Sequence, residues 1–406
     1  MRITQAVILC GGIGSRLGAL TAGTPKPLLP VDGTPFLQTL IQEITRYGVN
    51  RFLLLAAFES DQIKQFAKEL PERLGSKIEV VVSVEPERAG TGGAIFHARD
   101  ALDEAFYLFN GDTFLQTPLR DLAAFLDDET AIGALALRPL PDAGRYGVTT
   151  LKAGKVTAFG IRPLNPGPVL INGGVSAFRK SVVDYLTPCG SLEEDALPGL
   201  ASAGALRGMA VDGYFLDIGV PEDYLRAQTE IPALRRRPAL FLDRDGVLNL
   251  DHGHVGTLDR FEWIPGAREA VALANRSGFY VFIVTNQAGI AKGLYSLADY
   301  EALSRHIREG VAAVGGQIDD ERFCPNHPDA VIESYRGQSD WRKPAPGMIL
   351  DLVNKWPIDL DRSLMIGDRE TDIAAATAAG VRGHLFSGGR LDDFLRAVLA
   401  HDTDTI

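Results

Sequence analysis

The chain has 406 residues, of which 46% are hydrophobic and 23% are charged, and its formal net charge is −11. This balance is typical of a globular chain with a full core, and the length favours two or three domains. The acidic surplus argues against nucleic acid and anionic membranes as partners, because both bind through clustered cations. No window approaches the roughly 18 apolar residues of a membrane-spanning helix.

The cysteines and the N-terminal residues indicate the cellular compartment in which the protein works. The three cysteines, Cys10, Cys189 and Cys324, lie far apart and form no disulfide framework. The first residues contain one arginine and a short apolar run before the first glycines, which is unlike a secretory signal peptide. These features predict a cytoplasmic protein.

Apolar runs alternate with amphipathic stretches in both halves, which predicts an α/β fold with parallel sheets. In the first half we expect strands at 6–10, 52–57, 78–82 and 105–109, and helices at 35–47 and 221–228. The segment 230–238 contains two prolines and three arginines and is predicted to be a linker. The pattern then restarts, with strands at 239–242, 280–284 and 363–366 and a helix at 267–277. We therefore expect domains at 1–232 and 238–406.

A glycine-rich turn follows the first expected strand. It contains Gly11, Gly12 and Gly14, and Arg16 follows directly. Glycines let the main chain approach a polyphosphate, and the N–H groups of such a turn form an anion-binding nest. The turn matches neither GxGxxG nor GxxxxGK[ST], which argues against a dinucleotide-binding fold and a P-loop ATPase.

One lysine and two aspartates accompany this turn. Lys26 lies between two prolines, Asp112 ends an apolar strand, and Asp217 ends the run Tyr-Phe-Leu-Asp. Two aspartates at strand ends can share a Mg²⁺ ion, which prefers carboxylate and phosphate oxygens. Together with Arg16 and Lys26, such an ion would offset charge at an α-phosphate while pyrophosphate leaves.

In this order, the set resembles the sugar-1-phosphate nucleotidyltransferases over nearly all of residues 1–230. The resemblance implies a Rossmann-like, glycosyltransferase-A-like domain that binds the nucleotide base and ribose through Glu85, Gly90, Thr91 and Gly92. It places the sugar against 145–147 and against Asn172, Gly173 and Glu193. Where many members have Phe-x-Glu-Lys-Pro, residues 159–163 read Phe-Gly-Ile-Arg-Pro, so the acidic contact is missing while Arg162 keeps a positive charge.

Two segments narrow the resemblance within this family. Residues 171–175 and 212–224 look most like the heptose-1-phosphate guanylyltransferases, which implies GTP as the nucleotide. The mannose-1-phosphate guanylyltransferases and other hexose enzymes are close competitors.

The second half opens with two aspartates, Asp243 and Asp245, directly after an apolar strand. At this spacing one carboxylate can attack phosphorus while the other delivers or removes a proton. A metal is needed, because a carboxylate that attacks a phosphate dianion meets like-charge repulsion. Thr285 and Asn286 end the next strand. Further along the chain lie two cations and a possible metal ligand, namely Arg342, Lys343 and Asp368.

This order resembles the haloacid dehalogenase superfamily of phosphohydrolases, from about residue 238 to about residue 389. Segments 251–254, 285–293, 342–344 and 367–369 look like heptose 1,7-bisphosphate 7-phosphatase. The resemblance implies Asp243 as nucleophile and Asp245 as general acid and base. It implies Mg²⁺ bound by Asp243, the Asp245 carbonyl and Asp368. It places Thr285, Arg342 and Lys343 on the transferring phosphoryl group, and the remaining substrate contacts at Asp251, His254, Asn286 and Arg369.

The chain departs from these phosphatases at a loop that often binds zinc. Many members have Cys-x-His and later Cys-x-Cys before Arg-Lys-Pro, whereas here Asn326 takes the histidine position and Ser339 and Trp341 replace both later cysteines. Cys324 and His327 alone cannot complete a tetrahedral site, so we expect no zinc and a loop held by packing. His254 also stands where a tyrosine is frequent.

The activities implied for the two halves fit one reaction sequence. A phosphatase that removes the 7-phosphate of heptose 1,7-bisphosphate yields heptose 1-phosphate, which a guanylyltransferase would couple to GTP. The resemblances therefore imply a bifunctional enzyme that makes GDP-heptose from D-glycero-α-D-manno-heptose derivatives, with Mg²⁺ in both domains and small molecules as its partners. Two alternatives remain: a hexose-1-phosphate nucleotidyltransferase joined to a phosphatase of other specificity, or one joined to a non-catalytic module.

Overall fold

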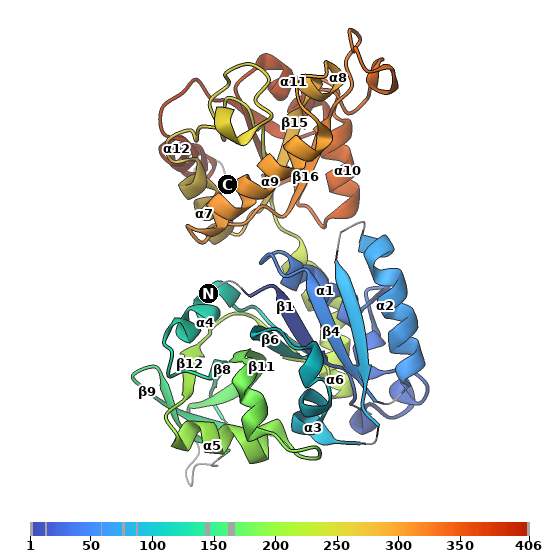
Figure 1. Ribbon diagram of the computed structural model, residues 1–406, viewed down its shortest axis with the longest axis vertical. Coiled ribbons are helices and arrows are strands. Elements are labelled where there is room, and N and C mark those ends of the chain that lie inside the picture. Colours follow the sequence, from blue (N-terminus) through green and yellow to red (C-terminus); the bar gives the residue numbers. More distant parts are fainter. Residues whose placement is uncertain are drawn as a thin grey trace. The chain divides into compact units, whose positions relative to one another are not determined.

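The computed structural model describes residues 3–12, 14–57, 59–74, 78–86, 88–142, 147–160 and 167–403. The chain divides into two compact units, Met1–Ile231 and Pro232–Ile406, which are treated separately below (Figure 1). Residues 143–146 and 161–166, which include Arg145, Tyr146 and Arg162 of the predicted sugar-side segments, lie outside the described residues. Within the described part of the chain, no helix is both long enough and apolar enough to cross a bilayer.

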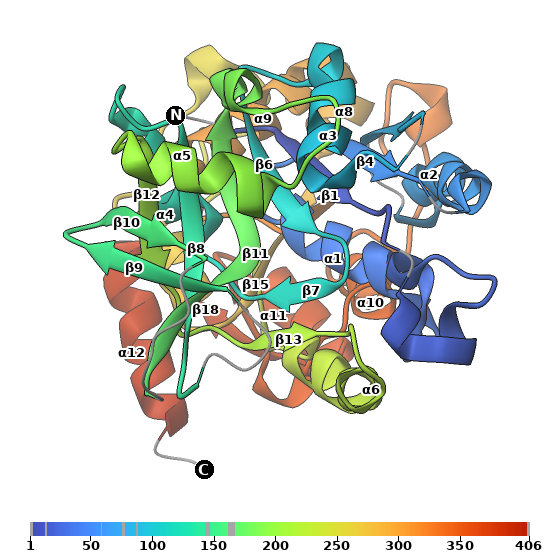
Figure 2. The ribbon, with the colours of Figure 1, turned by 90° about the horizontal axis from the view of Figure 1, so that it is seen from below.

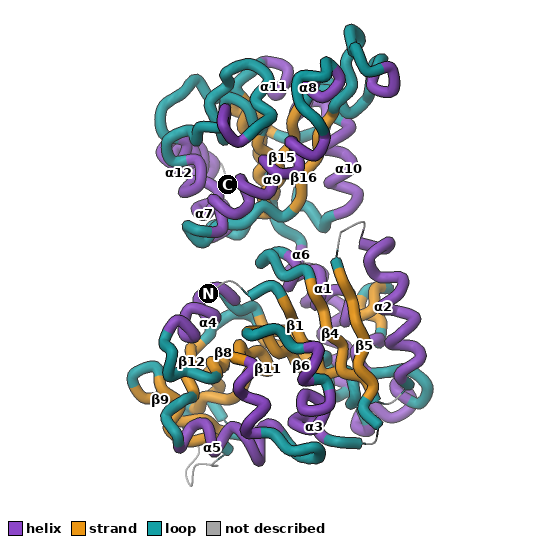
Figure 3. Tube along the Cα trace, viewed as in Figure 1, coloured by secondary structure: helices purple, strands orange, loops and turns teal. Residues whose placement is uncertain are grey.

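The first unit is built on a nine-stranded sheet in the order β5-β4-β1-β6-β11-β8-β12-β10-β9. Four parallel strands lie side by side in Figure 3, namely β5 (Glu79–Val84), β4 (Arg51–Ala56), β1 (Gln5–Leu9) and β6 (Ala105–Asn110), and their pairings give the directions. Side chains of β1, β4 and β6 form a continuous core, in which Val7, Leu53 and Phe106 are at most 1% exposed. Burial explains why these three strands are apolar runs. The edge strand β5 is more exposed, with Val81 at 44% and Val84 at 41%.

The prediction of parallel sheets is wrong for the rest of this unit. The central strand β11 (Val169–Arg179) runs antiparallel to β6 and to β8 (Gly133–Leu140). The remaining strands are β9 (Val148–Lys152), β10 (Lys155–Phe159) and β12 (Leu206–Ala210), of which only β12 pairs in parallel, with β8. An apolar strand pattern carries no information about direction, so the sequence could not show this change.

Two two-stranded ribbons and the helices α1 to α5 are further described elements of the first unit. One ribbon pairs β2 (Pro30–Val31) with β3 (Thr34–Pro35). The other pairs β7 (Thr113–Leu115) with β13 (Phe215–Asp217), and these two strands lie side by side in Figure 2. The helix α2 (Ser60–Leu74) packs on β4 and β5, and α5 (Leu197–Ser202) packs on β10 and β12. The other helices are α1 (Phe36–Thr45), α3 (Gly90–His97) and α4 (Leu119–Ala124).

The predicted linker is largely helical. Helix α6 (Pro221–Arg235) continues through Pro232 instead of ending near residue 228. Its apolar face stays buried beyond the predicted end, since Ala227 and Ile231 are at most 1% exposed. The main-chain N–H of Arg236 still donates to the Pro232 carbonyl at 3.1 Å. Packing of this face therefore outweighs the hydrogen bond that the proline removes.

The second unit is a five-stranded parallel sheet in the order β16-β15-β14-β17-β18. Its strands are β14 (Ala239–Leu242), β15 (Tyr280–Asn286), β16 (Asp320–Cys324), β17 (Leu364–Gly367) and β18 (Arg382–Leu385). Alternate residues face opposite sides. Leu240 and Leu242 join one core with α7 (Ala267–Arg276), α9 (Leu297–Ala312) and α12 (Leu391–Thr403). Ala239 and Phe241 join another with α10 (Gly347–Lys355) and α11 (Glu370–Ala378).

Both sheets reverse their strand order beside their first strand. In the first unit β1 lies between β4 and β6, and in the second β14 lies between β15 and β17. At such a point the loops that follow neighbouring strands separate, which opens a crevice at the carboxyl ends of the strands. The glycine-rich turn follows β1 and Asp243 follows β14. Each unit thus offers one crevice lined by the residues that follow its first strand.

Candidate active sites

In the first unit, the glycine-rich turn lies between β1 and a 3₁₀ helix, Ser15–Thr21. Gly14 has a φ of 66°, a left-handed conformation that favours glycine. A Cβ on Gly11 would lie 3.1 Å from Ala57 Cβ and 3.2 Å from Glu85 Oε1, so the turn passes close to Glu85. Beneath it, burial raises the pKa of the Cys10 thiol and Asp112 raises it further, so this cysteine is no nucleophile at neutral pH.

The ribbon of β7 and β13 brings the two predicted aspartates together. Asp217 pairs with Thr113, the neighbour of Asp112, and the Ile218 N–H donates to the Asp112 carbonyl at 3.0 Å. The buried Lys26 Nζ lies 2.5 Å from Asp112 Oδ2 and 3.6 Å from Asp217 Oδ1. Three residues that are up to 191 positions apart in the sequence thus form one charged centre.

A cavity of about 240 Å³ opens at this centre, lined mainly by polar groups that include Arg16, Asp112, Asn172, Gly173, Glu193 and Asp217. The Asn172 amide donates to Glu193 Oε1 at 2.8 Å and accepts from the Gly174 N–H at 3.2 Å. A Cβ on Gly173 would lie 2.4 Å from Leu115 Cδ2 and 3.0 Å from the Ala136 carbonyl oxygen, so glycine gives the tightest packing at the β-bulge of β11. The bulge aims Asn172 into the cavity.

The segment predicted to hold the nucleotide base does not line this cavity. Instead, Gly90–Gly93 packs against Gly190–Leu192, which precedes Glu193. The N–H groups of Gly92 and Gly93 donate to the Gly190 carbonyl at 2.9 and 3.2 Å, and the Leu192 N–H donates to Thr91 Oγ1 at 2.9 Å. The predicted base segment and the predicted sugar segment are therefore joined directly. We refer to these contacts as the glycine latch.

In the second unit, Asp243 follows β14 and is 8% exposed. Its Oδ1 accepts from the Arg244 N–H at 2.7 Å and lies 2.9 Å from Lys343 Nζ, which also lies 2.6 Å from Asp372 Oδ1. Burial raises the pKa of Asp243, Lys343 opposes this and Asp372 adds to it. Burial would lower the pKa of Lys343, but the two carboxylates raise it, so the ammonium stays charged. Both contacts of Asp243 use Oδ1, so Oδ2 has no donor among the described residues.

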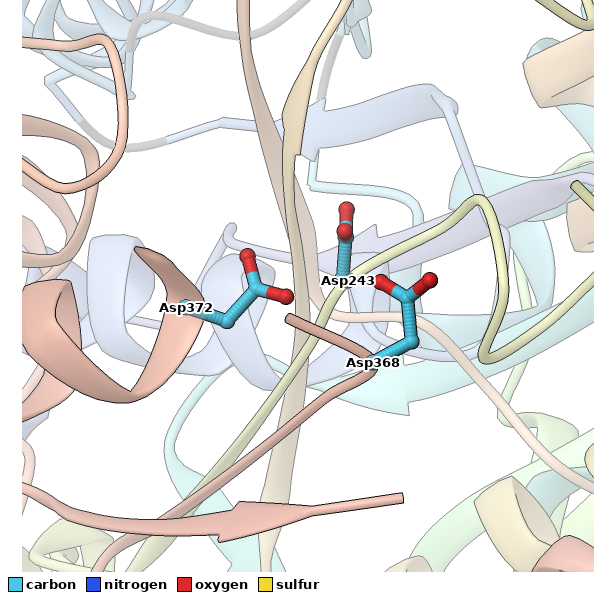
Figure 4. A group of neighbouring side chains, drawn as sticks. All are labelled: Asp243, Asp368 and Asp372. Atoms are coloured by element: carbon cyan, nitrogen blue, oxygen red, sulfur yellow. The ribbon is translucent and has the colours of Figure 1, made fainter. Parts of the chain in front are cut away.

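Three carboxylates converge here, from Asp243, Asp368 and Asp372 (Figure 4). Each offers an oxygen within 4.8 Å of the others, and this is the single group of three or more potential metal ligands in the described part of the chain. Asp368 Oδ1 is buried without a hydrogen-bond partner there. Burial and then the charges of Asp243 and Asp372 raise the pKa of Asp368 to about 6. An unpartnered oxygen beside two carboxylates is an environment that a divalent cation fits.

The sequence analysis did not single out Asp372. It lies in the first turn of α11, four residues after Asp368, and is 1% exposed. Its Oδ2 accepts from the Arg369 N–H at 3.0 Å, which caps the helix. An acidic residue one helical turn after a strand-end aspartate was the available signal, but helix caps commonly produce the same pattern.

The Asp245 carboxylate is turned toward another set of residues. Oδ1 accepts from Arg244 Nε and Nη2 at 3.1 and 2.8 Å and from Asn249 Nδ2 at 2.9 Å. Oδ2 accepts from Arg244 Nη2 at 2.9 Å and from Gln287 Nε2 at 3.1 Å. These donors explain why the Asp245 side chain is absent from the acidic group, although Asp245 lines the same cavity as Asp243.

This second cavity measures about 250 Å³ and contains the other predicted phosphatase residues, namely Asp251, His254, Thr285, Asn286, Arg342, Lys343 and Arg369. Asn286 and Lys343 exchange two hydrogen bonds of 3.1 Å between the amide of one and the main chain of the other. Arg342 Nη1 donates to the Asn326 carbonyl at 3.2 Å. Arg342 forms no ion pair with a carboxylate of the described residues. Lys343 thus lies beside the Asp243 carboxylate, and Arg342 lines the same cavity.

The loop after β14 forms another wall of this cavity. Asp251 Oδ2 lies 2.6 Å from Arg369 Nη2, and His254 has a φ of 52°. Lys292 Nζ lies 3.3 Å from His254 Nε2. Burial lowers the pKa of His254 and the charge of Lys292 lowers it further, so this imidazole is neutral at pH 7.

The loop after Cys324 was expected to hold its shape by packing, and hydrogen bonds contribute as well. The His327 N–H donates to the Tyr335 carbonyl at 3.1 Å, and the Arg342 N–H donates to the Ser339 carbonyl at 2.9 Å. The Ser339 hydroxyl accepts from the Trp341 N–H at 3.2 Å. The residues in place of the cysteines thus take part in turns, and Trp341 is 36% exposed.

Comparisons with known proteins assign both units. The nucleotidyl transferase family model matches residues 5–233, and the HAD-hydrolase-like model matches residues 340–402. The D-glycero-beta-D-manno-heptose-1,7-bisphosphate 7-phosphatase of Rhodopseudomonas palustris is 48% identical over 164 residues, which is 40% of this chain and 91% of that protein. The D-glycero-alpha-D-manno-heptose-1,7-bisphosphate 7-phosphatase of Burkholderia mallei is 45% identical over 143 residues, which is 35% of this chain and 76% of that protein.

Among solved structures, HddC from Yersinia pseudotuberculosis is 30% identical with a TM-score of 0.49, over 56% of this chain and 98% of HddC. HddC has also been solved in complex with GMP-PN. The chain belongs to the nucleotidyl transferase family, and its C-terminal part belongs to the family of the heptose bisphosphate phosphatases. The predicted fold class is thus confirmed: a nucleotidyltransferase domain followed by a haloacid dehalogenase-like phosphatase domain.

Proposed function

We propose that the chain is a bifunctional enzyme of GDP-heptose synthesis. Its second unit removes the 7-phosphate of heptose 1,7-bisphosphate, and its first unit couples the resulting heptose 1-phosphate to GTP with release of pyrophosphate. The observation that carries this proposal is the pairing of a nucleotidyl transferase unit with a unit that is 48% identical to a heptose bisphosphate phosphatase. The product of the phosphatase reaction, heptose 1-phosphate, is the substrate of the nucleotidyl transfer.

The contacts around Asp243 support its role as nucleophile. Its Oδ2 attacks phosphorus, and the bond from phosphorus to the sugar oxygen breaks while Asp245 gives a proton to that oxygen. Water then attacks the aspartyl-phosphate, Asp245 takes up the proton, and inorganic phosphate leaves Asp243 free again. Lys343 and Thr285 contact the transferring group, and Lys343 Nζ, 2.9 Å from Asp243, offsets its charge.

The acidic group supports a divalent cation in the second unit. We assign Mg²⁺ to Asp243, Asp368 and the Asp245 carbonyl, and we add Asp372 as a neighbour that the sequence analysis missed. When bound, the ion reduces the repulsion between the Asp243 carboxylate and the phosphate dianion. We expect Mg²⁺ and no stoichiometric zinc, since Cys324 and His327 lack further ligands in register. Metal analysis of protein purified without chelator tests both expectations.

In the first unit, Lys26 and Arg16 contact the phosphates, and Asp112 and Asp217 hold a second Mg²⁺. The support is the centre in which Lys26 Nζ contacts both carboxylates at the edge of the cavity. When bound, the ion offsets charge on the departing pyrophosphate. The pair of Asn172 and Glu193 lines the same cavity and offers a donor and an acceptor to sugar hydroxyls. Glu85 and the glycine latch hold the base and ribose next to Gly11.

The sugar anomer follows from the pairing of the two activities. Relatives of the second unit include phosphatases for the β and the α heptose bisphosphate, with similar identities of 48% and 45%. The sequence motifs of the first unit resemble guanylyltransferases, and the guanylyl-linked branch of this chemistry uses the α anomer. We therefore assign the α anomer and GTP.

Product analysis tests this proposal. The protein is incubated with Mg²⁺, one nucleoside triphosphate at a time, and either anomer of heptose 1,7-bisphosphate. We expect GDP-heptose from the α anomer with GTP, and a kcat/KM for GTP above those for ATP, CTP and UTP. Mannose 1-phosphate serves as the competing sugar. A higher kcat/KM with mannose 1-phosphate or another nucleotide would refute the assignment.

A further inference from the structure

Gln287 is a buried polar residue that the proposed chemistry does not yet use. It follows β15 directly and is 1% exposed. Its Nε2 donates to Asp245 Oδ2 at 3.1 Å and to Thr285 Oγ1 at 2.8 Å. Its Oε1 accepts from the Tyr295 hydroxyl at 2.6 Å. All three partners line the phosphatase cavity.

The orientation of this amide follows from its partners. A carboxylate only accepts hydrogen bonds, so the NH₂ group has to face Asp245. The Tyr295 hydroxyl donates to the amide oxygen on the opposite side. If the amide were flipped, its oxygen would face Asp245 Oδ2, which is also an acceptor. A buried amide with every contact made is held firmly, because each lost contact leaves an unpaired polar group.

This orientation determines what the Thr285 hydroxyl can do. Its oxygen accepts from Gln287, so its own proton remains available for donation. Among the described residues, no other side chain bonds to this hydroxyl, and Thr285 lines the cavity beside Asp243. Phosphoryl oxygens are acceptors, so the amide prepares Thr285 as a donor to the transferring group.

The same amide also directs the Asp245 carboxylate. Oδ1 receives three hydrogen bonds, from Arg244 and Asn249, whereas Oδ2 receives two. Oδ2 is therefore the oxygen with more room to exchange a proton with a substrate. Of its two donors, only Gln287 lies outside the loop that follows β14, and only Gln287 also contacts Thr285.

We infer that Gln287 is a positioning residue for phosphoryl transfer, an inference that rests on the phosphatase activity proposed above. Its single amide orients both the donor to the phosphoryl group, Thr285, and the acid and base, Asp245. The sugar oxygen leaves phosphorus as the bond to Asp243 forms, and it takes its proton from Asp245. Gln287 itself contacts neither the phosphoryl group nor the leaving oxygen.

The test compares Gln287→Met on two kinds of phosphate ester. Methionine keeps the chain length but removes all three hydrogen bonds of the amide. A sugar phosphate needs a proton on its leaving oxygen, whereas the aryl oxygen of p-nitrophenyl phosphate leaves without one. We expect kcat to fall about 100-fold or more on the sugar bisphosphate, the scale of general acid catalysis. On p-nitrophenyl phosphate we expect roughly a tenfold fall, the scale of one lost hydrogen bond, and KM should change little on either.

Two further variants separate positioning from folding. Gln317→Met is the matched control, because Gln317 is another buried amide of the same unit, 8% exposed, which donates to Asp319 Oδ1 at 3.0 Å outside the cavity. It should leave both rates near wild type. Gln287→Glu keeps the shape of the side chain but faces Asp245 with a second carboxyl group. It should therefore lose kcat on the sugar bisphosphate as Gln287→Met does, even if Gln287→Met folds poorly.

Equal losses on the two esters, or wild-type kcat in Gln287→Met and Gln287→Glu, would overturn the inference. A comparable loss in Gln317→Met would do so too, since it would indicate a general effect on packing. Fructose 1,6-bisphosphate serves as a second sugar ester. If wild type hydrolyses it and p-nitrophenyl phosphate but not heptose 1,7-bisphosphate, the substrate proposal fails and the comparison for Gln287 still decides its role.

Discussion

The pKa of Asp368 is determined by its burial and then by the charges of its neighbours. Lys343 lies between Asp243 and Asp372 and offsets both, whereas Asp368 Oδ1 has no donor among the described residues. Burial, followed by the two neighbouring carboxylates, therefore raises the pKa of Asp368 to about 6. At mildly acidic pH the folded protein holds a proton at this position. A divalent cation would compete with that proton.

This shift predicts a pH dependence of stability in metal-free protein. The folded pKa is about 6 and the ordinary value is 3.8, so the folded state binds the proton more tightly than the unfolded state. The stability from this proton is present below about 3.8 and is lost as the pH rises through about 6. Urea unfolding with chelator should show a decline over this window in wild type and in the exposed control Asp259→Asn, but not in Asp368→Asn. Parallel curves for all three proteins would contradict the assignment.

The positions of the strand-end carboxylates could be predicted from the sequence, but the directions of their side chains could not. Asp243 and Asp368 follow apolar strands, and the order of parallel strands brings such positions to one edge. The direction of the Asp245 side chain depends on Gln287, 42 residues away, and on the buried Arg244 between the two aspartates. No spacing rule encodes such a network, since it arises from packing around β15.

At the scale of elements, the glycine latch joins α3 to the segment before Glu193. Gly90 has a φ of 76°, and a Cβ there would lie 2.5 Å from the Gly190 carbonyl oxygen. Gly93 is similarly confined, with 2.7 Å to the Pro188 carbonyl oxygen. Main-chain carbonyls cannot move aside as a flexible side chain can. The close approach of the two segments therefore depends on glycine at both positions.

The variant Gly90→Ala should therefore separate the two segments. We expect the kcat/KM for nucleotidyl transfer to fall at least tenfold, while phosphate release by the second unit stays at the wild-type rate. The matched control is Gly204→Ala, since Gly204 has a φ of 67° and open space around a Cβ. It carries the same backbone strain of about 1 kcal/mol without the steric conflict. Kinetic assays of both activities in the two variants provide the measurement, and equal losses in transfer would argue against the latch.

Element types were predictable where local pattern and packing agree. The strands β1, β4, β5 and β6 and the helix α1 match apolar runs and amphipathic periods in the sequence. The antiparallel course of β11 and the continuation of α6 through Pro232 were not predictable, because both depend on packing partners far away in the sequence. Local preference for a break at proline was outweighed by the buried Ile231.

At the scale of the whole molecule, each compact unit carries its own cavity. The lining of one cavity comes entirely from residues 16–217, and that of the other entirely from residues 243–372. No described side chain lines both cavities. Each proposed reaction can therefore proceed without residues of the other unit. The intermediate, heptose 1-phosphate, would then pass between the sites through solution, and the fusion would raise its local concentration only modestly.

Separation of the two sites predicts complementation between inactive variants. Asp243→Asn removes the nucleophilic charge, so phosphate release should fall by several orders of magnitude while transfer to ready-made heptose 1-phosphate stays near wild type. Asp112→Asn removes a ligand of the Mg²⁺ ion proposed for the first unit, so transfer should fall while phosphate release is unchanged. Given heptose 1,7-bisphosphate, GTP and Mg²⁺, neither variant alone should make GDP-heptose. A mixture of the two should restore it, as measured by chromatography of the nucleotide sugar. If the mixture stays inactive while each variant keeps its remaining activity, heptose 1-phosphate does not leave the protein, and the two units are coupled through that intermediate.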